Sequence, residues 1–262
     1  MIKAAVLGSP ITHSLSPKIH KKAYEILGSV GEYTAIEVDE KIFPSFFSES
    51  AKNGWTGFSL TMPLKEIAIG YCDSVSETAL RINSANTLYR LESEWHATST
   101  DYLAFANLLK VSQDSKVAII GGGGTARAAA GALNSKVGKI DVLLRSPDRL
   151  IGMAKAAPEV SLTHLEMSAN LDSYDLIIQS TPVNVYDSYV NNLKNAQGTL
   201  VECLYKPWPT DFAKRYSELG GKVISGRDLL VEQALFQIEI FTGKTFSFDS
   251  MRTQLLSHVS KD

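Results

Sequence analysis

The sequence predicts an α/β protein built on parallel strands with helices packed against them. Short apolar runs rich in β-branched residues alternate with stretches of helical period, which is the order expected for strands joined by helices. One such strand, Val117–Ile120, runs directly into the glycines Gly121–Gly124 and then into an alanine-rich helix. The length of 262 residues is enough for one large or two modest domains.

The first part of the chain predicts a β-α-β-α-β unit. Strands are expected at residues 2–7, 33–38 and 56–61, and helices from Pro17 and over residues 42–53. This order implies parallel strands with helices on both faces of the sheet.

Two serines stand at the start of the first helix. Ser16 suits the N-cap and Pro17 suits the first helical position. Ser14 and Ser16 beside a helix N-terminus would also suit a carboxylate ligand, because free N–H groups and the helix dipole favour an anion there. Spacing alone favours the simpler role of Ser16 as a cap.

Thr61 and Lys65 follow the third strand. The carboxyl ends of parallel strands are where open α/β sheets build binding sites. A lysine at a helix start opposes the helix dipole, although an isolated lysine is most often an ordinary surface residue. Further on, residues 73–82 read as a helix and residues 88–91 and 95–98 as a hairpin. Asp101 is then a natural N-cap for a helix over 102–109, and capping alone could explain it.

The glycine cluster predicts a nucleotide site. Its spacing is close to G-x-G-x-x-G/A between a strand and a helix, which brings a pyrophosphate to the free N–H groups of the helix. The predicted contacts of this loop are Gly121, Gly122, Gly123, Gly124, Thr125 and Ala126.

The next strand, residues 139–144, indicates which dinucleotide binds. An NAD site would place an acid at the strand's end, but Asp141 lies near its start. The end carries Arg145, Ser146 and Arg149. Guanidinium groups bind phosphate through paired hydrogen bonds, so these residues suit a 2′-phosphate and favour NADP over NAD.

Further strands at 176–178, 199–201 and 222–224 continue this nucleotide-binding pattern. Their ends should line the same crevice as the glycine loop, through the residues Thr181, Pro182, Cys203, Tyr205 and Gly226. A long helix over 228–241 follows. Gln233 lies beside its apolar face, where a surface glutamine is the default.

Composition excludes several classes of function. The net charge is −2 without a basic run, and no apolar run is long enough to span a bilayer. No Cys/His cluster has metal-ligand spacing, so no metal is expected. The two cysteines suit reduced thiols, and strand-like sequence from Ile2 leaves no room for a signal peptide. We expect a cytoplasmic protein with a small-molecule substrate and no nucleic-acid or membrane partner, either monomer or homodimer.

Taken together, these motifs resemble the shikimate dehydrogenase family along nearly the whole chain. The opening resembles the family's pattern at Gly8-Ser-Pro-Ile-Thr-His-Ser14-Leu-Ser16-Pro17-x-x-His20. The other matching motifs follow in the family's order: Thr61-Met-Pro63-Leu-Lys65, Ala85-Asn86-Thr87, Thr100-Asp101, the glycine loop, Arg145, Tyr205-x-Pro207, and Gly226-x-x-Leu-Leu-Val-Glu-Gln233-Ala. Departures from the usual residues occur at Ser59, Ser99, Ala104, Leu144 and Gln179, and none removes a proposed catalytic group.

The resemblance implies NADP-dependent reversible reduction of 3-dehydroshikimate to shikimate. It makes Lys65 and Asp101 the catalytic pair at the reacting oxygen, and Ser14 and Ser16 ligands of the substrate carboxylate. It further implies that the ring and its hydroxyls contact Thr61, Asn86, Tyr205 and Gln233. The alternatives are a quinate/shikimate dehydrogenase that uses NAD, and a catalytically weak homologue that only binds a ligand.

The same resemblance assigns the domains. Residues 1–102, with the C-terminal residues 228–262 packing back on them, form the expected substrate domain. Residues 103–227 form the expected Rossmann-type NADP domain, with a cleft between the two. No Gly/Pro-rich linker separates them, so the boundaries should fall inside or beside secondary structure.

Overall fold

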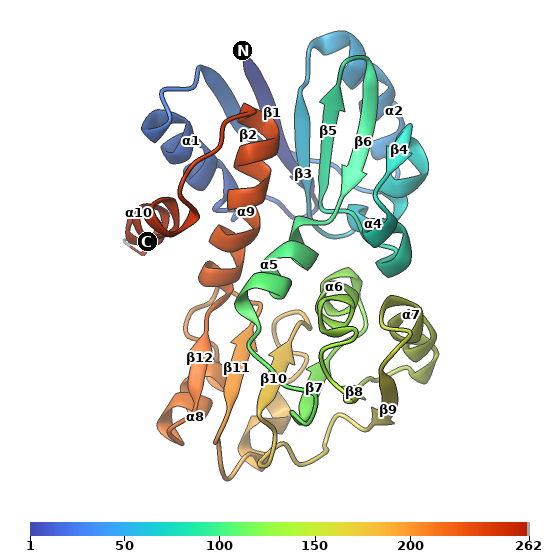
Figure 1. Ribbon diagram of the computed structural model, residues 1–262, viewed down its shortest axis with the longest axis vertical. Coiled ribbons are helices and arrows are strands. Elements are labelled where there is room, and N and C mark those ends of the chain that lie inside the picture. The colour runs from blue at the N-terminus through green and yellow to red at the C-terminus, as the bar shows by residue number, and fades with distance from the viewer. Residues whose placement is uncertain (261–262) are drawn as a thin grey trace. The chain divides into compact units, whose positions relative to one another are not determined.

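The computed structural model describes residues 1–260 (Figure 1). The chain forms two compact units. The first comprises Met1–Leu103 and the chain from Leu230 onward, and the second comprises Ala104–Leu229. Both crossings fall inside helices, namely α5 (Thr100–Leu108) and α9 (Gly226–Thr242).

The first unit contains a six-stranded mixed sheet in the order β2-β1-β3-β5-β6-β4. Its strands are β1 (Ile2–Gly8), β2 (Gly31–Glu37), β3 (Gly57–Leu60), β4 (Ser74–Val75), β5 (Thr87–Leu91) and β6 (Glu94–Thr98). β1 pairs in parallel with β2 and β3, as the β-α-β-α-β order predicted. The predicted hairpin, β5–β6, extends this parallel part of the sheet by pairing with β3 in the antiparallel direction, which makes the sheet mixed.

Alternate residues of β1 face opposite sides of this sheet, as the period of a strand requires. Ala5 and Leu7 lie in one buried cluster, which also holds residues of α2 (Phe43–Ser50). Ala4 and Val6 lie in another, together with Tyr24 of α1 (Ser16–Ile26). Helices therefore cover both faces, which explains why β1 reads as a continuous apolar run.

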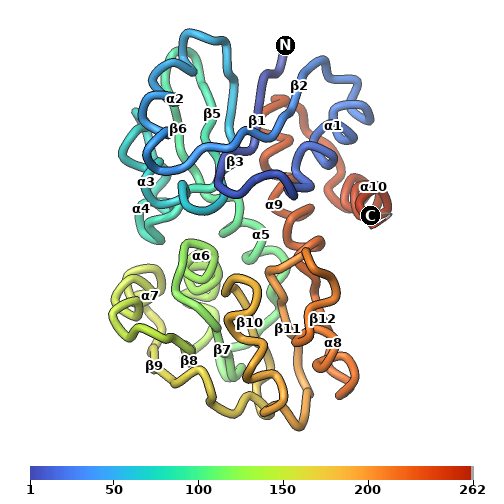
Figure 2. The backbone as a smooth tube through the Cα atoms, turned by 180° about the vertical axis from the view of Figure 1, so that it is seen from behind, coloured from blue at the N-terminus to red at the C-terminus, as the bar shows by residue number. Residues whose placement is uncertain are grey.

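The C-terminal helices pack on α1. Ile19 and Ala23 of α1 share a buried cluster with residues of α9 and of α10 (Phe248–Val259). Figure 2 shows α1 beside α10. A two-point ion pair joins α10 to α9. Arg252 Nε donates to Glu232 Oε2 at 2.6 Å, and Arg252 Nη2 donates to Glu232 Oε1 at 3.1 Å. The Glu232 side chain is fully buried.

Arg252→Met is expected to lower the free energy of unfolding by about 3 kcal/mol, because it leaves a buried carboxylate without its cation. Asp249→Asn is the matched control, since Asp249 bonds the same arginine but is 95% exposed. That change should cost less than about 0.5 kcal/mol. Urea unfolding of the two variants measures the difference, and equal small losses would contradict this account.

One predicted helix of the first unit is wrong in its first half. Residues 73–82 contain the short strand β4 and then α4 (Glu77–Ile82). Ser76 caps α4 by accepting from Ala79 N, so the helix cannot extend back through it. The segment after β3 is also shorter than a full helix, with α3 (Leu64–Ile67) passing into a 3₁₀ turn at Ala68–Tyr71.

The second unit contains a parallel sheet in the order β12-β11-β10-β7-β8-β9. Its strands are β7 (Val117–Ile120), β8 (Lys139–Leu143), β9 (Ser161–Leu165), β10 (Leu176–Gln179), β11 (Thr199–Glu202) and β12 (Lys222–Ile224). Five of them match predicted strands, whereas β9 was not predicted. The chain reverses direction across the sheet between β7 and β10, and such a switch point is where dinucleotides bind.

Helices flank this second sheet, including α6 (Gly124–Leu133), α7 (Leu150–Ala156) and α8 (Asp211–Glu218). Only α6 was predicted. Phe212 and Tyr216 of α8 pack with Ala118, Ile120 and other sheet residues in one buried cluster. In the part of the chain from residue 1 to 260, no helix has both the length and the apolar character that crossing a bilayer requires.

Candidate active site

Lys65 and Asp101 form a close ion pair in the first unit. Lys65 lies in α3, just past β3, and its carbonyl accepts from Ala85 N at 2.8 Å. Asp101 lies in the first turn of α5. Lys65 Nζ donates to Asp101 Oδ2 at 2.6 Å, and the two side chains are only 16% and 9% exposed. A lysine at a helix start is thus matched to a carboxylate from another helix.

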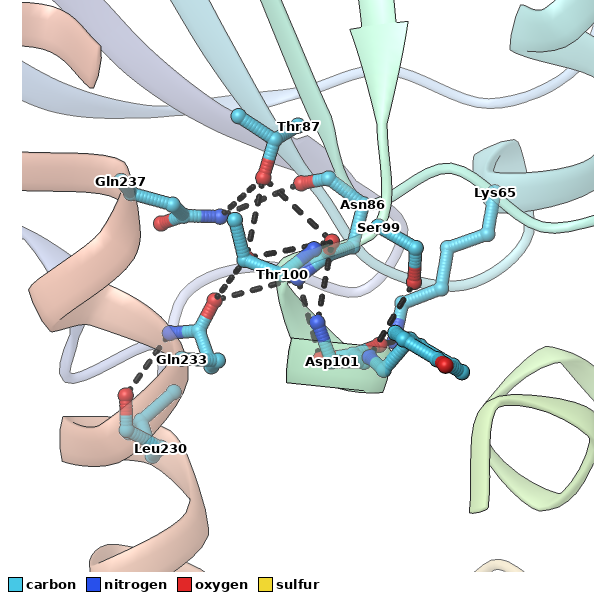
Figure 3. Close-up of polar contacts among 10 residues, drawn as sticks. Lys65, Asn86, Thr87, Ser99, Thr100, Asp101, Leu230, Gln233 and Gln237 are labelled. Atoms are coloured by element: carbon cyan, nitrogen blue, oxygen red, sulfur yellow. Dashed lines mark hydrogen bonds and ion pairs between the residues drawn. The ribbon is translucent and has the colours of Figure 1, made fainter. Parts of the chain in front are cut away.

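Asn86 lies beside this pair (Figure 3). Its Nδ2 donates to Asp101 Oδ1 at 3.0 Å, to Thr100 Oγ1 at 2.9 Å and to Gln233 Oε1 at 3.1 Å. Its Oδ1 accepts from Thr100 N at 2.7 Å. Asn86 thereby connects the Lys65–Asp101 pair to Gln233 on α9, and all these groups belong to the first unit.

Two local interpretations need correction at this cluster. Asp101 does not cap the helix. α5 begins at Thr100, and the free N–H of Tyr102 donates to Ser99 Oγ at 3.3 Å. The Asp101 carboxylate is therefore available to Lys65 and Asn86. Gln233 is not a surface residue but is 6% exposed, and its amide donates to Leu230 O at 2.7 Å.

The serine motif lies at the start of α1. Ser16 is buried within the helix rather than preceding it, so its predicted role as N-cap is wrong: the capping position is Leu15, which makes no side-chain bond. Ser14 is half-buried and its Oγ accepts from Ser16 N at 3.3 Å. Thr61 follows β3, where its N–H donates to Leu7 O at 2.9 Å. A Cβ on Gly8 would lie 2.3 Å from the Thr61 methyl, so glycine there lets the strand ends approach.

This cluster suits proton transfer to or from an oxygen. An ammonium held by a carboxylate, with little water around it, can donate a proton and stabilise negative charge on a substrate oxygen. The amides of Asn86 and Gln233 add hydrogen-bonding groups of the kind that orient hydroxyls.

The glycine loop lies in the second unit, between β7 and α6. Gly121 has a φ of +111°, and a Cβ there would lie 2.7 Å from Ser180 Oγ. A Cβ on Gly123 would meet nothing within 4 Å, so the space beside this residue is open. Gly123 is also the capping position of α6, where it carries no side chain. The loop thus presents bare backbone and a helix N-terminus, which fits the pyrophosphate of a dinucleotide.

Arg145, Ser146 and Arg149 lie beside this loop, in the segment after β8. All three are exposed, and a Cβ on Gly122 would lie 2.9 Å from Arg149 Cβ. Asp148 is exposed in the same turn, so the segment carries two cations against one anion. Asp141 is engaged elsewhere, with Tyr174 donating to its Oδ2 at 2.8 Å. The residues present therefore fit the 2′-phosphate of NADP.

The other predicted cofactor residues lie at the same edge of this sheet. β10 pairs with β7 and β11, and β11 pairs with β12, all in parallel. The segments that follow these strands therefore emerge together, and they contain the predicted cofactor residues Thr125, Ala126, Thr181, Pro182, Cys203 and Gly226. They also contain Tyr205, which was predicted to contact the substrate. Thr181 is held by Gln179, whose Oε1 accepts from its N–H at 2.7 Å and its hydroxyl at 2.9 Å. Gly226 leaves room for the backbone of Leu204, which a Cβ would approach to 2.5 Å.

Sequence reasoning missed a buried carboxyl at this edge. Glu202 ends β11 and accepts from Leu204 N at 3.1 Å and Thr210 Oγ1 at 2.8 Å. Burial raises its pKa from 4.5 to about 7, against the opposing effect of these two hydrogen bonds. Glu202 thereby holds together the turn that carries Cys203 and Tyr205.

Because the folded pKa of Glu202 exceeds the unfolded value, its carboxyl favours the folded state below pH 4.5, and this contribution is lost as pH rises through about 7. Compared with Glu202→Gln, the wild type should therefore lose unfolding free energy between about pH 4.5 and pH 7. Urea unfolding of both proteins across this range measures the difference. A difference that stays constant with pH would contradict the buried, protonated carboxyl.

The fold and these sites define a class: an α/β protein with a dinucleotide-binding unit and a second unit that carries a lysine–carboxylate pair. Comparison with known proteins identifies the family within this class. A sequence profile of the shikimate dehydrogenase substrate binding domain matches residues 6–88. A shikimate dehydrogenase (NADP(+)) of Exiguobacterium sp. is 30% identical over 244 residues, which span 91% of this chain and 92% of the relative.

Solved structures agree. The crystal structure of Mycobacterium tuberculosis shikimate dehydrogenase superposes with a TM-score of 0.88 at 33% identity, covering 98% of this chain and 99% of the other. Thermus thermophilus shikimate 5-dehydrogenase, solved in complex with NADP(H) and shikimate, gives 0.86 at 28% identity and covers 98% and 100%. The chain belongs to the shikimate dehydrogenase family.

Proposed function

We propose that this protein catalyses the reversible, NADP-dependent reduction of 3-dehydroshikimate to shikimate. The observation that carries the proposal is the Lys65–Asp101 pair at 2.6 Å, shielded from water and bonded to Asn86. The family relationship supports the substrate, since relatives over nearly the whole chain are shikimate dehydrogenases (NADP(+)).

The glycine loop, together with Arg145 and Arg149, would hold NADPH, which would supply a hydride for the reduction of the carbonyl. As the carbonyl oxygen gains negative charge, the Lys65 ammonium stabilises it and then donates the proton that gives the hydroxyl. Asp101 holds the ammonium in place through its Oδ2, while its Oδ1 accepts from Asn86. In the oxidative direction the Lys65 amine receives the same proton.

The remaining polar residues orient the substrate in this proposal. Ser14 and Ser16 bind its carboxylate at the start of α1. The ring hydroxyls are held by Thr61, Asn86, Gln233 and Tyr205.

Both cysteines are free thiols, and we infer a reducing, cytoplasmic setting for the reaction.

Cofactor choice depends on Arg145 and Arg149 in this proposal. Replacing both by alanine should raise the KM for NADP by at least about tenfold, since each paired phosphate contact is lost, and leave the KM for NAD unchanged. Asp148→Asn is a control of opposite sign, because removing the anion from the same turn should lower the KM for NADP. Initial rates at saturating shikimate measure both constants. An equal rise for the two cofactors would contradict recognition of the 2′-phosphate.

A further inference from the structure

The side-chain amide of Gln237 in α9 is fully buried and uses all its hydrogen-bonding groups. Its Nε2 donates to Thr87 Oγ1 at 2.9 Å and to Asn86 O at 3.2 Å. Its Oε1 accepts from Ser59 Oγ at 2.7 Å and lies 3.2 Å from His20 Nε2. A backbone carbonyl only accepts, so the end of the amide that faces Asn86 O must be the NH₂ group, and the orientation is fixed.

On one side, this amide is connected to residues of β2 and α1. Tyr33 of β2 donates its hydroxyl to Ser59 Oγ at 2.6 Å. The Tyr33 ring stacks on His20 with centroids 3.9 Å apart and planes within 9°. A hydrogen-bonded path therefore runs from Tyr33 through Ser59 to Gln237.

The other side leads to the catalytic pair. Thr87 Oγ1 lies 3.0 Å from Thr100 Oγ1, which accepts from Asn86 Nδ2 at 2.9 Å (Figure 3). Gln233, one helical turn before Gln237, contacts the Asn86 side chain, whereas Gln237 contacts its carbonyl. Two glutamines of α9 thus hold one asparagine, and that asparagine bonds Asp101.

We propose that Gln237 is a positioning residue: it fixes the Asn86–Thr87 segment, and through it the amide that Asn86 presents to Asp101. A satisfied buried network of this kind rigidifies the groups it joins. Small displacements of substrate-orienting groups are costly for rate, at up to about a hundredfold for 1 Å. This role rests on the function proposed above for the Lys65–Asp101–Asn86 cluster.

Gln237→Met keeps the length of the side chain and removes its polar groups. We expect kcat/KM for shikimate to fall by about tenfold to a hundredfold, while the KM for NADP stays unchanged. Gln254→Met is the matched control, because Gln254 is exposed on α10 and should change neither value. A folded Gln237→Met protein with the wild-type kcat/KM for shikimate would overturn the proposal.

A relocated amide separates positioning from general packing. Ser59 and Thr87 are direct partners across β3 and β5, so their side chains share a face. In the double variant Gln237→Ala with Ser59→Asn, the asparagine at position 59 on the neighbouring strand β3 can place its amide in the space left by Gln237 and reach Thr87. This double variant should recover most of the lost kcat/KM, whereas Gln237→Ala alone should not. If Gln237→Met fails to fold, the double variant decides: recovery supports positioning, and a folded but slow protein contradicts it.

A readout without turnover keeps this proposal distinct from the proposed function. The Asn86 side-chain amide protons, assigned by NMR with Asn86→Asp, should exchange slowly in the wild type and faster in Gln237→Met. Unchanged exchange would contradict the positioning role even if the enzyme is active. A wild type that fails to oxidise shikimate, yet shows the exchange difference, would overturn the proposed function and leave Gln237 as the residue that orders Asn86.

Discussion

Replacing Lys65 by methionine is expected to lower kcat for shikimate oxidation by about a thousandfold, because the change removes both the proton-transfer group and the charge that stabilises the developing oxyanion. The side chain is 16% exposed and lies 2.6 Å from Asp101, so methionine fills its space without the ammonium. Steady-state rates with NADP and shikimate measure the loss.

Lys22→Met is the matched control for this change. Lys22 also pairs with a carboxylate, at 3.0 Å, but on the surface of α1. It should keep the wild-type kcat. Calorimetry should show that Lys65→Met still binds shikimate, since the carboxylate and hydroxyl ligands are assigned to other residues. A Lys65→Met enzyme that retains more than about a tenth of the wild-type kcat would contradict the assignment of proton transfer to Lys65.

Two alanine substitutions in the glycine loop should differ in their effects on thermal stability and on the affinity for NADP. Gly121→Ala places a Cβ 2.7 Å from Ser180 Oγ at a φ of +111°, so it should lower both the melting temperature and the affinity for NADP. Gly123→Ala projects into open space at an ordinary φ of −83°, so the melting temperature should hold. Its methyl group would nevertheless stand where the pyrophosphate approaches, and the affinity for NADP should fall by at least about tenfold.

Thermal unfolding and NADP titration of the two variants separate these effects. Both variants should retain shikimate binding, because none of the residues assigned to the substrate lies in this loop. Wild-type NADP affinity in Gly123→Ala would contradict the placement of the dinucleotide at this loop.

The parts of the fold that could be predicted depend on local signals. β1, β7 and β10 are buried on both faces and therefore appear in the sequence as apolar runs. The glycines directly after β7 predict a tight turn at that point. β9 was missed because it is an edge strand, exposed or only half-buried along its length, with polar residues among its five. The antiparallel pairing of the β5–β6 hairpin with β3 was not predicted. The strand beside which a hairpin packs is determined by tertiary contacts and cannot be read from the residues of the hairpin itself.

The site shows the same division. The family motifs singled out Lys65, Asp101, Asn86 and Gln233, and the structure brings these four together. The N-cap of α5 was predicted wrongly, since the N–H of Tyr102 in the first turn donates to Ser99 and not to Asp101. Gln237 was missed, although its position four residues after Gln233 places both on one helical face. The partners of such a buried amide come from distant strands, so only the fold reveals its role.

The most direct test of the central claim is the initial rate of cofactor reduction by the wild type, with shikimate, with quinate and without substrate, using NADP and then NAD. We predict strong reduction of NADP that depends on shikimate, with quinate and NAD both poor. Efficient turnover of quinate with NAD would instead support a quinate/shikimate dehydrogenase. No reduction of either cofactor by a folded protein that binds NADP would contradict the proposed activity and indicate a homologue that only binds its ligand.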